Sequence, residues 1–126
     1  MILLRHYRYG ANQVLWEIPA GTIEKEETAS DCAKRELEEE TGYQARRWKK
    51  LMSCFASPGF NTEVIHCYLA QDLRKVQVQL EDDDVLEMRV VSIKEVKKMI
   101  LQKQIRDAKS LVALFYFFAH RENHEC

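Results

Sequence analysis

The chain has 126 residues, of which 46% are hydrophobic and 31% charged, and this balance predicts one compact domain and excludes a multidomain or disordered protein. Its 19 Lys and Arg residues against 20 Asp and Glu residues give a formal net charge of -1. No general electrostatic attraction draws such a chain to nucleic acid or to an anionic membrane, so we expect neither as a partner. An anionic ligand would have to be bound by local charges.

The cysteine pattern and the length of the apolar segments bear on where in the cell we expect the protein. Cys32, Cys54, Cys67 and Cys126 form no C-x-x-C pair, and no secretory signal begins the sequence, so we expect the reducing cytoplasm. The longest apolar run, residues 111–119, is far shorter than the roughly 20 residues that a membrane-spanning helix requires.

Short segments rich in β-branched and aromatic residues predict the strands. In chain order they are 2–9, 14–18, 51–56, 64–70, 76–80 and 88–91. Segment 76–80 alternates apolar and polar residues with a period of two, which is typical of a strand with one buried face.

Three segments have helical spacing. The first, 28–41, begins with Thr28 and Asp31 in capping relation and ends before Gly42. The second follows Ser92, and the third covers about 105–120 and is apolar nearly all round, so we expect it to be packed on both sides. Together the elements predict an α/β (α+β) fold in which helices cover both faces of a mixed β-sheet.

The first helix carries an acidic cluster that needs an explanation. At about 100° per residue, Glu36 and Glu40 share a face with small apolar side chains, and Glu39 adds a third negative charge close by. These carboxylates repel one another and lie at the negative end of the helix dipole. A divalent cation would resolve the conflict, and oxygen-only ligands favour Mg²⁺, with Mn²⁺ possible, over zinc. The alternative is a solvated acidic face that Lys34 and Arg35 balance.

The segment 21–43, GTIEKEETASDCAKRELEEETGY, resembles the signature of the Nudix hydrolase family, G-x5-E-x7-R-E-U-x-E-E-x-G-U, at every defined position. The resemblance implies a single Nudix domain over 1–126, built as an α/β/α sandwich with a loop-helix-loop catalytic motif. It also implies hydrolysis of a nucleoside diphosphate linked to a further group.

The resemblance assigns roles to the signature residues. Glu36 and Glu40 are implied metal ligands, Glu39 is a ligand or orients the attacking water, and the carbonyl of Ala20 completes the shell. Glu39 and Glu40 are therefore candidate catalytic residues. Four further positions are implied to be structural: an ion pair fixes the helix against its loop, and two glycines turn the backbone into and out of the helix. They are Glu27, Arg35, Gly21 and Gly42.

A general base is expected outside the signature, because a carboxylate bound to metal is a poor base. The acidic run 81–84 is the candidate segment. Asp84 aligns with the glutamate that the family usually carries, and Asp82 is the second candidate. A solvated turn is the alternative for this run.

Flanking segments resemble the ADP-ribose pyrophosphatase branch of the family. They are Leu4-Arg5-His6-Tyr7-Arg8, Trp16-Glu17-Ile18-Pro19-Ala20-Gly21 and Ser57-Pro58-Gly59-Phe60. The resemblance implies that Arg8 contacts substrate phosphates, with Arg5 as a further candidate. Gly59 and Phe60 are candidates for the pocket of the terminal ribose, although a turn residue packed on the core is an equal alternative.

The start of the chain departs from this branch. Members usually carry an N-terminal strand region that supplies adenine-stacking aromatic residues and much of a dimer interface, whereas here Met1 opens directly on the first predicted strand. We therefore expect a weakened selectivity for the nucleoside. An uncovered strand at 1–9 would also be a pairing surface, which predicts a homodimer.

The leading hypothesis is a Mg²⁺-dependent pyrophosphohydrolase that cleaves ADP-ribose, or a similar nucleoside diphosphate sugar, to a nucleoside monophosphate and a sugar phosphate. One alternative keeps the site and changes the substrate to GDP-mannose, a dinucleoside polyphosphate or a nucleoside triphosphate. The other is a catalytically silent module that binds ADP-ribose.

Overall fold

The computed structural model describes residues 1–77 and 85–125, with side chains as far as residue 123. Five strands and three helices lie in these ranges. In chain order they are β1 (Ile2–Arg8), β2 (Gln13–Glu17), α1 (Ala29–Thr41), β3 (Tyr43–Phe55), β4 (Val64–Lys75), β5 (Val85–Val90), α2 (Ile93–Leu101) and α3 (Ala108–Glu125).

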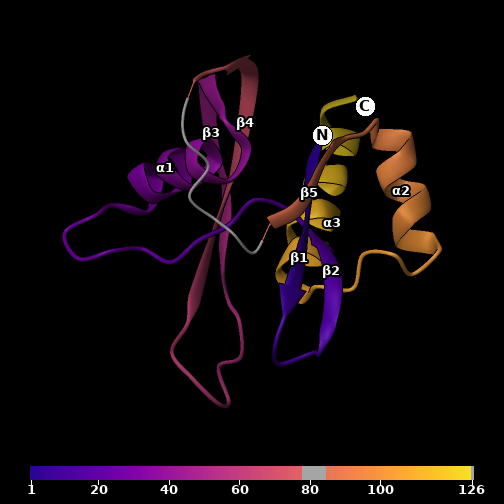
Figure 1. Ribbon diagram of the computed structural model, residues 1–126, viewed down its shortest axis with the longest axis horizontal. Coiled ribbons are helices and arrows are strands. Elements are labelled where there is room, and N and C mark those ends of the chain that lie inside the picture. Colours follow the sequence, from indigo (N-terminus) through magenta and orange to yellow (C-terminus); the bar gives the residue numbers. More distant parts are fainter. Residues whose placement is uncertain (78–84, 126) are drawn as a thin grey trace.

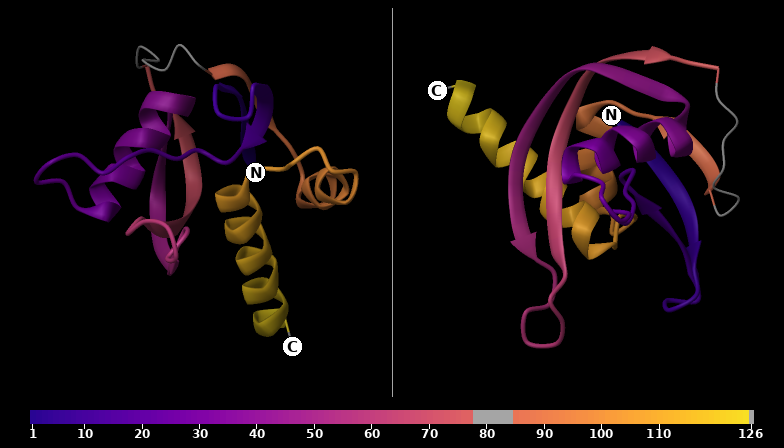
Figure 2. Two further views of the ribbon diagram at one scale, coloured as in Figure 1. Left: turned by 90° about the horizontal axis from the view of Figure 1, so that it is seen from below. Right: turned by 90° about the vertical axis from the view of Figure 1, so that its left-hand side faces the viewer.

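The described strands form two antiparallel sheets. One has the order β2-β1-β5, and the other is the long hairpin of β3 and β4. Figure 1 shows the hairpin with α1 on one side of the molecule and the three-stranded sheet with α2 on the other. The views in Figure 2 place the hairpin between α1 and α3. The α+β architecture expected from the sequence is therefore present, with two antiparallel sheets instead of one mixed sheet.

The antiparallel pairing follows from the connections between strands. Residues 9–12 join β1 to β2, and residues 56–63 join β3 to β4, and connections this short return the chain beside itself in the opposite direction. A parallel pair would need a longer crossover segment.

The hydrophobic core lies between the three-stranded sheet and helices α2 and α3. Its buried members come from β1, α2, the loop before α3, and α3, which explains how the last third of the chain is fixed to the first strand. They are Leu3, Val96, Met99, Ile105, Leu114 and Phe118.

Both helix starts expected at Thr28 and Ser92 are confirmed. The Thr28 hydroxyl accepts a hydrogen bond from the Asp31 amide at 3.1 Å, and the Ser92 hydroxyl accepts one from the Glu95 amide at 3.1 Å. These bonds satisfy amide groups that have no partner within the first turn of a helix.

Strands β3 and β4 are longer than the sequence pattern predicted. The pairing continues from Tyr43 opposite Lys75 as far as Phe55 opposite Val64. The expected strand at 76–80 is not present in its described part, because residues 76 and 77 follow β4 without strand geometry. Residues 78–80 lie outside the described ranges.

The sheet-edge argument for a homodimer is wrong. Strand β1 is the central strand of its sheet, paired with β2 on one edge and with β5 on the other. Its backbone groups are therefore used within the chain and offer no free edge to a second copy.

Helix α3 begins later than expected and is packed on one side only. It starts at Ala108, because the Asp107 carboxylate accepts hydrogen bonds from the Ser110 amide and hydroxyl at 3.1 and 2.6 Å. Val112, Phe115 and Tyr116 on this helix are exposed. Among the described residues, no helix is long and apolar enough to cross a membrane.

We predict that Met99→Ala lowers the free energy of unfolding by about 2–5 kcal/mol, because it leaves a cavity in the core between α2 and the sheet. Met99 is 1% exposed, whereas Leu101 on the same helix is 82% exposed. Urea denaturation of both variants is the measurement. An equal loss in Met99→Ala and in the control Leu101→Ala would contradict this packing.

Candidate active site

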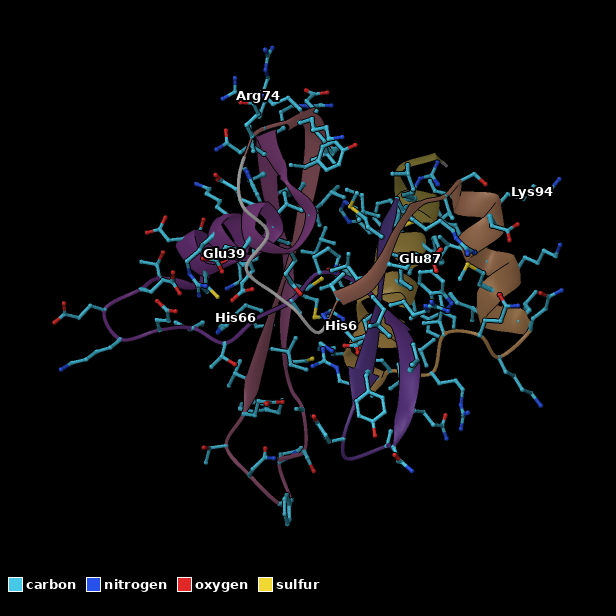
Figure 3. The ribbon with its side chains drawn as sticks, in the orientation of Figure 1. His6, Glu39, His66, Arg74, Glu87 and Lys94 are labelled. Atoms are coloured by element: carbon cyan, nitrogen blue, oxygen red, sulfur yellow. The ribbon has the colours of Figure 1, made fainter. Side chains whose placement is uncertain are left out.

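A cavity of about 870 Å³ lies between the β3–β4 hairpin and the half of the molecule that contains β1 and α3. Most of its lining is apolar, but a few charged side chains from distant parts of the sequence reach it. They include Arg8 of β1, Glu36 of α1 and Lys109 of α3. Ala20 and Gly21, which precede α1, also line it. Figure 3 labels Glu39 on α1 and His6 on β1, the latter near the middle of the molecule.

The guanidinium of Arg35 bonds to three carboxylates, one of which, Glu36, lines the cavity. It forms two bonds to Glu27, from Nε at 2.7 Å and from Nη2 at 3.0 Å, which is the ion pair that the sequence resemblance implies. Its Nη1 donates to Glu36 at 2.9 Å and to Glu39 at 3.0 Å. One cation therefore offsets the repulsion between Glu36 and Glu39 and fixes the loop before α1 to the helix.

This ion cluster changes the acidity of its members. The hydrogen bonds from Arg35 lower the pKa of Glu27 from 4.5 to about 2. The same bonds to Glu27 raise the pKa of Arg35 above its ordinary value. Both groups are consequently ionised across the pH range in which enzymes usually work.

Gly21 provides space for the carboxylate of Glu36. A Cβ at this position would lie 2.0 Å from Cδ and 2.1 Å from Oε1 of that side chain. Among the described glycines, only Gly42 has a left-handed backbone, with φ of 73°. The reason expected for Gly21, a turn of the backbone, is therefore replaced by close approach of a side chain, whereas Gly42 ends α1 as expected and donates its amide to the Glu38 carbonyl.

Glu40, the third candidate metal ligand of α1, is a buried carboxylate. It is 3% exposed, and its Oε1 accepts a hydrogen bond from the Ala20 amide at 2.8 Å. Its Oε2 lies 3.4 Å from Nε2 of His6, a buried residue of β1. Glu40 thus fixes the backbone of the loop before α1, next to the carbonyl of Ala20 that is the implied metal ligand.

The three candidate metal ligands do not converge on one point. Glu36 and Glu39 meet at Nη1 of Arg35, whereas Glu40 faces the Ala20 amide and His6. In the described ranges, no three His, Cys, Asp or Glu side chains form a group that could hold a metal ion. The carboxylate oxygens around Arg35 still provide the hard, anionic donors that suit a divalent cation.

The two arginines considered for substrate binding lie in different surroundings. Arg8 lines the cavity and forms a bidentate ion pair with Glu17, at 2.6 and 2.8 Å. Arg5 lies 3.4 Å from Glu87 and stacks near the ring of Trp16, and it does not line the cavity. Residues three apart on a strand face opposite sides of the sheet, which separates the two side chains.

Gly59 and Phe60 lie in the loop between β3 and β4, outside the lining of the cavity. The Phe60 amide donates to the Ser57 carbonyl at 2.9 Å in a turn, and the Phe60 side chain is 88% exposed. Figure 1 shows this loop at the far end of the hairpin from α1. The candidate bases Asp82 and Asp84 lie outside the described residues.

Comparison with known proteins decides the family. A family model described as "NUDIX domain" matches residues 1–114, which include all of β1 to α2 and the first turns of α3. The chain belongs to the Nudix family.

Several known proteins are similar in sequence to this chain over most of its length. An ADP-ribose pyrophosphatase of Bacillus subtilis is 35% identical over 118 residues, which are 92% of this chain and 64% of the relative. A methanol dehydrogenase activator of Bacillus methanolicus is 36% identical with the same coverage of each chain. A GDP-mannose pyrophosphatase of Klebsiella pneumoniae is 30% identical over 125 residues, which are 92% of this chain and 63% of the relative. The chain thus spans just under two thirds of the length of these relatives.

A solved structure has the same fold. The crystal structure of an ADP compounds hydrolase superposes with a TM-score of 0.87 at 22% sequence identity, over 98% of this chain and 66% of that one. In the present chain, the Nudix signature covers the loop before α1, the helix itself, and Gly42 and Tyr43 after it.

Two ionisable residues near the site were given no role by sequence reasoning. Glu17 is 1% exposed and bonds to Arg8 and Lys109, and the buried His6 lies between Glu17 and Glu40. A carboxylate between Trp16 and Ile18 in a strand was a usable signal, because burial of a charge requires a partner.

The Glu27 and Arg35 pair predicts a pH dependence of stability. Because the pKa of Glu27 is depressed in the folded state, its contribution is present above about 4.5 and is lost as the pH falls toward about 2. We expect Glu27→Gln to lower the melting temperature near neutral pH, with a difference from the unmodified chain that narrows over this window. Circular dichroism melts at several pH values measure it.

The matched control is Glu24→Gln, because Glu24 is 69% exposed and lies 3.7 Å from Arg35. We expect that change to have a small effect at every pH, as exposed ion pairs contribute little. A constant difference for Glu27→Gln across the acid range would contradict the assigned ion pair.

Proposed function

We propose that this Nudix chain is a divalent-metal-dependent pyrophosphohydrolase that cleaves the diphosphate of ADP-ribose, or of a similar nucleoside diphosphate sugar, to a nucleoside monophosphate and a sugar phosphate. The observation that carries the proposal is the position of the Glu36 carboxylate. It lines an 870 Å³ cavity, next to Glu39 at the shared Arg35, and Arg8 and Lys109 line the same cavity. Carboxylates for a metal and cations for phosphate oxygens are the two groups that diphosphate hydrolysis requires.

The relatives support this substrate class. One is named as an ADP-ribose pyrophosphatase at 35% identity, and another as a GDP-mannose pyrophosphatase at 30% identity. Both substrates join a nucleoside to a sugar through a diphosphate. We place ADP-ribose first because its relative has the higher identity, and GDP-mannose second.

Glu36, Glu39 and Glu40, with the carbonyl of Ala20, are the residues that would hold Mg²⁺ or Mn²⁺. Their hard oxygen donors fit such ions better than they fit zinc. A bound divalent cation would offset charge on the phosphoryl oxygens and increase the acidity of a coordinated water.

The remaining residues of the site act through position and charge. Arg35 keeps Glu36 and Glu39 side by side, and Glu40 fixes the backbone at Ala20. Arg8 presents a guanidinium to the cavity, where it would bind a phosphate oxygen. In the proposed reaction the oxygen of water forms a bond to phosphorus while the bond to the bridging oxygen breaks. The water proton passes to a general base, for which Asp84 and Asp82 stay predictions.

Two finer expectations accompany the proposed activity. The described cysteines, Cys32, Cys54 and Cys67, are free thiols, which suits the cytoplasm that we propose as the compartment. The homodimer stays a prediction that no longer rests on a free edge of β1.

We predict that the purified chain releases AMP from ADP-ribose only when Mg²⁺ or Mn²⁺ is present, and that chelation with EDTA stops the reaction. In a substrate panel we expect ADP-ribose to be cleaved faster than GDP-mannose, and both faster than ATP. Chromatography of the products measures the rates. A failure to cleave any nucleoside diphosphate sugar in the presence of either metal would refute the proposed function.

We predict that Glu36→Gln lowers kcat by about 100-fold or more, because it removes an anionic ligand from the reaction centre. It should also weaken Mn²⁺ binding measured by electron paramagnetic resonance, while the circular dichroism spectrum stays unchanged. Glu38→Gln is the control on the same helix, because the Glu38 carboxylate accepts a bond from Gln44 instead. Equal rates in the two variants would remove Glu36 from the site.

A further inference from the structure

A buried histidine on the central strand lies between two carboxylates that belong to different elements. His6 of β1 is 2% exposed, and Glu40 of α1 is 3% exposed. Nε2 of His6 lies 3.4 Å from Oε2 of Glu40, and Nδ1, on the other side of the ring, lies 4.0 Å from Oε2 of Glu17. Neither the sequence resemblance nor the proposed function assigns a role to His6, so an imidazole at this place needs an explanation.

The alternation of β1 brings the His6 ring to this place. Residues two apart on a strand share a face, so His6 lies on the same face as Leu4 and Arg8. Leu4 is 0% exposed, whereas Arg8 lines the cavity. The ring of His6 therefore lies between the interior of the molecule and the cavity.

A β-bulge lies at this position of the sheet. Arg5 is opposite Glu87 of β5, but the next residue of β1 is opposite Val85. Strand β5 thus has one residue more than β1 over this step. On the other edge, His6 keeps its regular pairing with Leu15 of β2. Bulges are over-represented beside active sites, where they change the direction of a side chain. The irregular pairing is a second feature, independent of the ring contacts, that distinguishes His6 from the rest of β1.

The chemistry of the two groups determines which ring atom carries a hydrogen. An ionised carboxylate only accepts hydrogen bonds, so a ring nitrogen that bonds to it must donate. For the contact between His6 and Glu40 this requires a hydrogen on Nε2. The other oxygen of Glu40 accepts from the Ala20 amide at 2.8 Å. The carboxylate is thus contacted at both oxygens, by β1 on one side and by the loop before α1 on the other.

Contacts at both oxygens suit a carboxylate that binds a metal. A buried charge is costly unless its partners compensate for the lost water, so these contacts favour an ionised Glu40 inside the protein. A carboxylate has about four acceptor sites, so two such contacts are compatible with a further one to a cation. Side chains that orient a metal ligand commonly change metal affinity by about 10- to 100-fold.

We propose that His6 is a positioning residue: through its Nε2–H it holds the carboxylate of Glu40 in the orientation in which that carboxylate binds a divalent cation. The role of Glu40 as a ligand rests on the proposed function. His6 touches neither the cation nor the nucleotide and acts only through Glu40. An apolar side chain at position 6 would fill the same space but would leave one oxygen of Glu40 without this contact.

The position of the ring hydrogen tests the contact in the chain without metal. We expect nitrogen NMR spectra of the chain with isotope-labelled histidine to show a hydrogen on Nε2 of His6. The resonance is assigned by its loss in His6→Gln. A ring whose single hydrogen is on Nδ1 would overturn the proposal, because Nε2 could not then donate to Glu40.

Mn²⁺ binding, measured by electron paramagnetic resonance, tests the positioning role without catalysis. We expect His6→Leu to raise the Kd for Mn²⁺ about tenfold or more. His6→Gln should restore most of the affinity, because its amide offers an N–H donor in place of Nε2–H. The matched control is Leu4→Val, which alters a buried side chain on the same face of β1 without removing a polar contact, and it should leave Kd unchanged. Equal Kd values for His6→Leu and Leu4→Val would overturn the assignment, as would a His6→Gln variant that binds as weakly as His6→Leu.

The effect of His6 should depend on the presence of the Glu40 carboxylate. In a chain that already carries Glu40→Gln, we expect His6→Leu to change the Kd for Mn²⁺ much less, because the two residues act through one contact. An undiminished effect in that background would show that His6 acts elsewhere. Thermal melts establish that each variant is folded. If His6→Leu does not fold, the ring hydrogen in the unmodified chain remains the deciding measurement.

Failure of this inference is distinguishable from failure of the proposed function. If the chain cleaves ADP-ribose but His6→Leu binds Mn²⁺ as tightly as Leu4→Val does, the function stands and the positioning role is lost. If the chain cleaves no nucleotide sugar, yet His6→Leu weakens Mn²⁺ binding and His6→Gln restores it, the positioning role stands and the function is lost.

Discussion

The candidate site depends on the contact between Arg35 and three glutamates. Glu27 comes from the loop before α1, whereas Glu36 and Glu39 come from the helix, and a single guanidinium bonds to all three. Without this cation, Glu36 and Glu39 would repel each other, and the loop would lose the ion pair by which Glu27 is attached to the helix. The arrangement keeps carboxylate oxygens close together at the edge of a cavity, where their mutual repulsion would otherwise separate them.

A second ion network contributes Arg8 and Lys109 to the cavity that Glu36 of the first also lines, and its charges are reversed. Around Arg35 one cation organises several carboxylates, and around Glu17 one carboxylate organises two cations. The two networks arise from different elements, and the buried His6 lies near Glu17 of the second network and near Glu40, which is on the same helix as Glu36 and Glu39. A ligand with both phosphate oxygens and bound metal has complementary charges for each.

Local signals and distant contacts differ in how well the sequence predicts them. The bounds of α1 followed from Thr28 and Gly42, because capping bonds and a left-handed residue depend on a few neighbouring positions. The full length of β3 and β4 was not predicted, since charged residues such as Arg47 and Asp72 pair across the exposed hairpin and interrupt the apolar pattern. The bond between Glu17 and Lys109 joins residues 92 positions apart, and no local pattern specifies such a contact.

The close approach of Gly21 to Glu36 makes the conformation of that glutamate depend on the residue at position 21. Since a Cβ at position 21 would overlap the carboxyl group of residue 36, the volume available at one position is set by the side chain at the other. With a larger residue at position 21, the flexible side chain of Glu36 would have to turn away, and its carboxylate would leave its present place beside Arg35. The absence of a side chain before the helix thus sets, by size and not by charge, where an acidic group on the helix can lie.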